Sequence, residues 1–140
     1  MKKFLLLSVF ISFLFFNYVN GQKNPVLVRQ SFLTGIDLPQ RSMRYNADSM
    51  VSSARNFLQQ QARLYGSNVN NVEVLRASGS GDSIVSRLKR ANWTVIPDEH
   101  DKRFFWITRG SRSMLAYYSG SGVDGNLYFG ETDKLPKLRR

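Results

Sequence analysis

The stretch NADSMVSSARNFLQQQARLYG, residues 46–66, carries the strongest structural signal in this chain. Its apolar side chains recur every three or four residues, and serine, asparagine, glutamine and arginine fill the positions between them. This spacing is typical of an α-helix that turns one face toward a core. Asn46 or Asp48 is expected to cap the first amides, and Gly66 to end the helix in a left-handed turn. The apolar positions are Met50, Val51, Ala54, Phe57, Leu58, Ala62 and Tyr65.

A strand and a second helix are expected to follow this first helix. The run VEVLR, residues 72–76, is rich in apolar and β-branched residues, which predicts a buried or half-buried strand. The next run, SGSGD at residues 78–82, predicts a turn, after which Asp82 or Ser83 caps the second helix. The apolar face of that helix is expected to consist of Ile84, Val85, Leu88 and Ala91.

The C-terminal half of the chain predicts an antiparallel sheet. Short runs of apolar and aromatic residues alternate there with turn-forming residues at spacings typical of hairpins. The expected strands are residues 94–96, 103–108, 112–118 and 126–129. Together with the two helices, they predict an α+β domain in which both helices pack on one face of a small, mainly antiparallel sheet.

The first 21 residues predict a cleavable signal peptide. Lys2 and Lys3 precede an almost unbroken apolar run, Phe4 to Phe16, which is shorter than the roughly 20 residues of a membrane span. We expect cleavage before Gln22, with an uncleaved N-terminal anchor as the alternative. The mature protein is therefore expected to be periplasmic or secreted.

The rest of the chain is expected to divide into three parts. Residues 22–45 predict an N-terminal arm with one short strand, and residues 46–131 predict the compact α+β domain. Residues 132–140 contain a proline and four cations, which is typical of a frayed basic tail.

The composition describes a basic protein without cysteine. The formal net charge of the chain is +10, and removal of residues 1–21, which hold two lysines and no acidic residue, leaves +8. Such a charge favours anionic partners such as phospholipid headgroups, lipopolysaccharide, nucleic acid or acidic protein surfaces. The alternative is that the charge only keeps the protein soluble. The absence of cysteine excludes disulfides, thiolate metal ligands and a lipobox thiol.

Candidate catalytic groups are few. His100 is the only histidine, and it lies among acidic residues in the expected turn 98–101. Catalytic bases and metal sites need converging groups on rigid elements, so we expect no catalytic residue, no metal site and no cofactor. One enzymatic alternative remains open, because a small basic ribonuclease needs only His100, an arginine, and a glutamate such as Glu73, Glu99 or Glu131.

Aromatic residues on the expected strands predict a binding surface. Adjacent pairs such as Phe104–Phe105 and Tyr117–Tyr118 cannot both face one core, so some aromatic surface remains for a partner. A protein partner is favoured over nucleic acid, since an exported protein meets less nucleic acid. The expected binding residues are Val95, Trp106, Arg109, Arg112, Tyr117 and Tyr128.

The order of elements from residue 46 to residue 129 is similar to that of a known family. A helix, the strand VEVL at 72–75, the segment GDSIVSRLKRANWTV at 81–95, an acidic turn and a hairpin follow one another. This pattern resembles the TrbH-like family of conjugal transfer proteins and the secretin N-domain-like modules of type IV secretion systems. The resemblance implies a compact unit that docks on neighbouring subunits of an envelope complex, and it implies no catalytic residues. Members are commonly lipoproteins, whereas this chain has no cysteine to acylate.

The sequence thus predicts an exported, non-enzymatic binding or assembly module, an accessory component of a conjugal transfer or type IV secretion apparatus. The two alternatives are a small secreted ribonuclease-like enzyme and a protein that binds anionic lipid or lipopolysaccharide.

Overall fold

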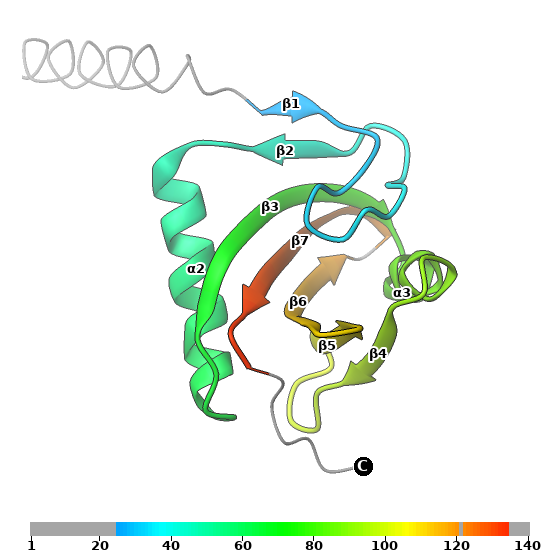
Figure 1. The fold of residues 1–140 in the computed structure, drawn as a ribbon. Helices are drawn as coiled ribbons and strands as arrows, with labels where there is room; N and C mark the ends of the chain where they lie inside the picture. Colours follow the sequence, from blue (N-terminus) through cyan, green and yellow to red (C-terminus); the bar gives the residue numbers. More distant parts are fainter. Residues whose placement is uncertain (1–24, 121, 135–140) are drawn as a thin grey trace, which may run out of the picture.

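The computed structural model describes residues 25–120 and 122–134, and Figure 1 shows the path of the chain. The expected signal peptide, residues 1–21, and positions 135–140 of the expected tail lie outside the described residues. No helix in the described part of the chain has the length and apolar character needed to cross a membrane.

One antiparallel sheet dominates the described residues. Its seven strands lie in the order β1-β2-β3-β7-β6-β5-β4, so the two edges are β1 and β4. Two helices accompany the sheet, and the α+β class is confirmed. The strands are β1 (Val26–Leu27), β2 (Met43–Tyr45), β3 (Val69–Gly79), β4 (Thr94–Pro97), β5 (Phe104–Arg109), β6 (Arg112–Gly120) and β7 (Gly122–Thr132), and the helices are α2 (Asp48–Arg63) and α3 (Gly81–Arg90).

The two helices cover opposite faces of the sheet, and Figure 1 shows them on its two sides. On the α2 face, Leu58 belongs to the same core cluster as Val74, whereas on the α3 face Leu88 belongs to that of Leu75. The expected placement of both helices on one face is therefore wrong. The central strands carry apolar residues at consecutive positions, so both faces of the sheet are apolar and each one needs a cover.

The ends of both helices differ slightly from expectation. Ala47 is the N-cap of α2 and makes no capping hydrogen bond through its side chain, so neither Asn46 nor Asp48 occupies the cap position. Gly66 has a φ of 74°, which confirms the left-handed turn after α2. At α3 the cap is Ser80, whose side chain accepts a hydrogen bond from the amide of Ser83. Strand β3 continues to Gly79, and the helix therefore begins directly after Ser80.

The described part of the expected arm is built into the same core. It contributes β1 and β2 to the sheet, and the loop between them buries Leu33, Ile36 and Leu38 on the α3 face. Strand β7 likewise runs past the expected domain boundary at residue 131, and Asp133 accepts a hydrogen bond from the amide of Asn68.

Candidate functional site

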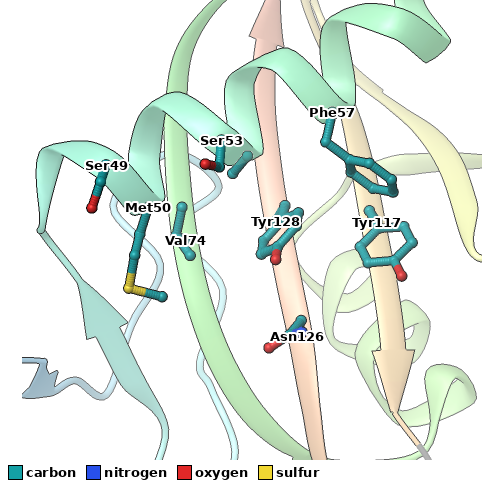
Figure 2. A pocket seen from close by; sticks show the side chains of 9 residues that line it. Ser49, Met50, Ser53, Phe57, Val74, Tyr117, Asn126 and Tyr128 are labelled. Atoms are coloured by element: carbon teal, nitrogen blue, oxygen red, sulfur yellow. The ribbon is translucent and has the colours of Figure 1, made fainter. Parts of the chain in front are cut away.

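A groove of about 440 Å³ lies between α2 and the sheet (Figure 2). The side chains of α2 point down toward strands β3, β7 and β6, which form the floor. Helix α2 contributes Ser49, Met50, Ser53, Ala54 and Phe57 to the lining, and the sheet contributes Val74, Tyr117, Asn126 and Tyr128. We name this feature the α2 groove.

Strand register builds the floor of the α2 groove. Val74 of β3 pairs with Tyr128 of β7, and Tyr128 pairs with Tyr117 of β6. Tyr117 pairs in turn with Phe104 of β5. Directly paired residues point to the same face, so these four side chains form one row across the sheet.

Aromatic contacts hold the wall and floor of the α2 groove together. The ring of Phe57 meets the ring of Tyr117 edge to face, with 4.7 Å between centroids, and meets that of Tyr128 at 6.1 Å. The two tyrosine rings are 5.4 Å apart. Such contacts stabilise beyond the apolar area they bury, and they restrict ring movement. The groove is therefore a formed surface feature.

The α2 groove is electrically neutral. None of its lining residues is Asp, Glu, His, Lys or Arg. Burial, followed by the nearby Tyr117, raises the pKa of Tyr128, so its hydroxyl stays protonated at neutral pH. Arg103 lies just outside, with its guanidinium 5.5 Å from the centre of the Tyr117 ring, and its charge is paired with the carboxylate of Asp101 at 2.8 Å. A second, smaller hollow of about 240 Å³ continues the groove toward Tyr45 and Arg76.

The structure brings two of the six expected binding residues together. Tyr117 and Tyr128 both lie in the α2 groove. Trp106 lies on the same face but is fully buried, with its ring 5.6 Å from that of Tyr65, so it belongs to the core.

The other three expected residues lie on the opposite face. Val95 is partly buried against the α3-face core. Arg109 and Arg112 extend over the ring of Trp93, with their guanidinium carbons 4.4 and 5.6 Å from its centre. The six expected residues therefore do not form one surface.

The three glutamates of the ribonuclease alternative differ in position, because Glu99 adjoins His100 in an exposed turn, whereas Glu73 and Glu131 pair with arginines elsewhere. His100 is exposed in the β4–β5 turn. Glu73 is buried in an ion pair of 2.7 Å with Arg44, and Glu131 pairs with Arg112 at 3.0 Å. Within residues 25–120 and 122–134, no group of three or more histidine and acidic side chains is placed to hold a metal ion.

Sequence reasoning assigned Met50 and Phe57 to the core-facing stripe of the helix and did not single out Asn126. The structure leaves Met50 41% exposed at the wall of the groove. A usable signal exists in the sequence: Ser49 and Ser53 interrupt the stripe with small polar side chains that leave space beside Met50 and Phe57.

Comparison with protein-family models, curated proteins and solved structures finds no match to this chain. Its function must therefore be inferred from the geometry of the molecule itself.

Proposed function

We propose that this chain is an exported, non-enzymatic protein-binding module and that the α2 groove is its binding surface. One observation carries the proposal: three aromatic rings, two tyrosine hydroxyls and one amide line a neutral groove on the outside of the fold. Protein interfaces favour this combination, since aromatic residues contribute much of the binding energy and ionised groups are depleted at interface centres.

The partner that fits this groove is a protein segment with an apolar side chain. The volume of about 440 Å³ lies within the usual range of ligand pockets. The hydroxyl of Tyr128 and the amide of Asn126 offer hydrogen bonds to the backbone of such a segment. Because the chain carries a formal net charge of +10, acidic residues next to the apolar side chain would favour the encounter.

The resemblance to TrbH-like and secretin N-domain-like proteins completes the proposal. It makes the chain an accessory component of a conjugal transfer or type IV secretion apparatus, in which the partner segment belongs to a neighbouring subunit.

A peptide titration tests the role of the groove. The probe is a twelve-residue peptide with a central Leu-Phe pair flanked by aspartate and glutamate, added to the ¹⁵N-labelled protein. We expect amide shifts that cluster at residues 49–57 and 126–128, since these segments line the groove. A peptide with serine in place of Leu-Phe should cause no such cluster. Shifts that map to another surface, or no shifts with the acidic peptide, would contradict the proposal.

Two neighbouring serines provide a matched pair of variants. Ser53→Trp places a large ring inside the groove and should weaken peptide binding at least about tenfold by exclusion. Ser52→Trp makes the same change one residue earlier on α2, outside the groove lining, and should bind as the wild type does. Equal affinities of the two variants would exclude the groove as the binding site.

A further inference from the structure

A cluster of arginines surrounds the C-terminal end of α3, on the face opposite the α2 groove. Arg87 and Arg90 come from the last turn of the helix, and Arg109 and Arg112 come from either side of the β5–β6 turn. Arg87, Arg90 and Ala91 line one surface hollow, and Arg109 donates a hydrogen bond to the carbonyl of Ala91. We name these four residues the arginine patch.

Contacts with neutral groups hold the patch in place. Arg109 lies over the ring of Trp93, which is 2% exposed, and Arg112 reaches over the same ring. Arg112 also donates to the carbonyl of Leu33 at 2.8 Å, and Arg87 donates to that of Asp37 at 3.1 Å. Carbonyl oxygens and an aromatic ring orient the guanidinium groups without cancelling their charge.

Acidic side chains offset the charge of the patch only in part, although Asp37 lines the same hollow as Arg87 and Arg90. Glu131 forms an ion pair with Arg112 at 3.0 Å, and the Asp37 carboxylate accepts a hydrogen bond from Gln30. Among the described residues, Arg87, Arg90 and Arg109 have no carboxylate within ion-pair distance. The patch therefore keeps a surplus of positive charge, to which Lys89 of the same helix turn adds.

An exposed aromatic side chain lies one residue away from a backbone contact of the patch. Leu33 accepts the hydrogen bond from Arg112, and the residue before it, Phe32, is 59% exposed. The guanidinium of Arg44 lies 4.7 Å from the centre of the Phe32 ring. A cationic surface with an exposed aromatic residue at its border is typical of proteins that lie on anionic membranes.

We propose that the arginine patch and Phe32 dock the protein on an anionic phospholipid surface. The arginines would bind headgroup phosphates, while Phe32 would enter the boundary between headgroups and acyl chains. A nucleic acid fits less well, because Trp93 is buried under the arginines and offers no platform for base stacking within the patch. This role goes beyond the proposed protein binding, and both surfaces can be occupied together because they lie on opposite faces.

Vesicle flotation tests the proposal with the mature chain that starts at Gln22, the form expected after export. The probes are vesicles of phosphatidylcholine alone and vesicles of phosphatidylcholine mixed with phosphatidylglycerol. We expect strong preference for the anionic vesicles, and this preference should fall steeply as salt rises from about 0.05 to 0.5 M. Equal binding to both vesicle types would overturn the proposal.

Two charge reversals separate the patch from net charge. Arg90→Glu changes a patch residue, whereas Arg63→Glu makes the same change in the last turn of α2 on the other face. Each cation near an anionic surface contributes roughly a fivefold factor in binding, so Arg90→Glu should weaken binding at least about fivefold. Arg63→Glu should weaken it far less. Both positions are exposed, and circular dichroism will verify that both variants fold.

Two further measurements complete the test. Phe32→Ser should remove much of the binding that persists at high salt, since that part depends on apolar insertion. An equal loss of vesicle binding in Arg90→Glu and Arg63→Glu would mean that net charge alone drives binding. That result would overturn the proposal. Tight, patch-dependent binding of a single-stranded oligonucleotide without vesicle binding would also overturn it and indicate a nucleic-acid surface.

Discussion

Glu73 and Arg44 form an ion pair of 2.7 Å in which the carboxylate side chain is fully buried and the guanidinium side chain is 19% exposed. The same carboxylate accepts hydrogen bonds from the hydroxyl of Ser31 and the amide of Phe32. One residue of β3 thus fastens β2 and the loop that carries Phe32. The loop's position on the α3 face, and with it the border of the arginine patch, depends on this carboxylate.

Replacement of Glu73 by alanine should lower the free energy of unfolding by about 3–5 kcal/mol, because the variant leaves buried partners without their acceptor. Urea unfolding followed by circular dichroism measures the change. The matched control is Glu131→Ala. The side chain of Glu131 is 30% exposed, so loss of its ion pair with Arg112 should lower the free energy of unfolding by less than about 1 kcal/mol. Comparable losses in the two variants would show that the buried pair has no special role.

Gly130 of β7 packs against Leu58 of α2 without room for a side chain. A Cβ atom at this position would lie 2.8 Å from Leu58 Cδ1 and 2.9 Å from Val69 Cγ1. Gly130→Ala should therefore destabilise the protein by about 1–3 kcal/mol through overpacking. The control is Gly81→Ala at the start of α3, where the nearest atom is 3.8 Å away, and this change should be neutral or slightly stabilising. Thermal unfolding of both variants measures the difference in stability. A Gly130→Ala protein as stable as the wild type would refute the packing of Gly130 against Leu58 and Val69.

The hydroxyl of Tyr65 donates a hydrogen bond to the carboxylate of Asp98, which links the C-terminal end of α2 to the turn after β4. Burial, and then the hydrogen bond to Asp98, raises the pKa of Tyr65 to about 12. Burial acts to raise the pKa of Asp98 as well, but hydrogen bonds from Tyr65 and from the amides of His100 and Asp101 outweigh it and lower that pKa below 3.8. Two opposite pH effects follow.

Stability should fall at both ends of the pH scale. The folded protein holds the Tyr65 proton more tightly than the unfolded chain, so this contribution is complete below the ordinary pKa of 10.0 and is lost as the pH rises toward about 12. The Asp98 contribution is present above pH 3.8 and is lost as the pH falls through the lowered pKa of the folded state. Tyr65→Phe should flatten the alkaline decline in a series of urea unfolding curves. Asp98→Asn should reduce both declines, and an unchanged alkaline slope in Tyr65→Phe would contradict this account.

The types of the elements could be read from the sequence because they depend on neighbours along the chain. The helical spacing in residues 46–66 matches α2, and Gly66 ends it as expected. Each run expected to form a strand overlaps an observed strand, so the α+β class was predictable. The adjacent aromatic residues Tyr117 and Tyr118 do point to opposite faces, but both are buried because each face has its own core, so the expected surplus of aromatic surface is not found there.

The arrangement of those elements was decided by contacts between residues far apart in the chain. Consecutive apolar residues such as Val74 and Leu75 show that both faces of a strand are covered, but not which helix covers which face. The pairing of Val74 with Tyr128 and the hydrogen bond from Arg112 to Leu33 join segments that sequence periodicity treats separately. Local spacing determines what each segment becomes, whereas strand register and the burial of both sheet faces determine which side chains meet. The α2 groove and the arginine patch both depend on this tertiary arrangement.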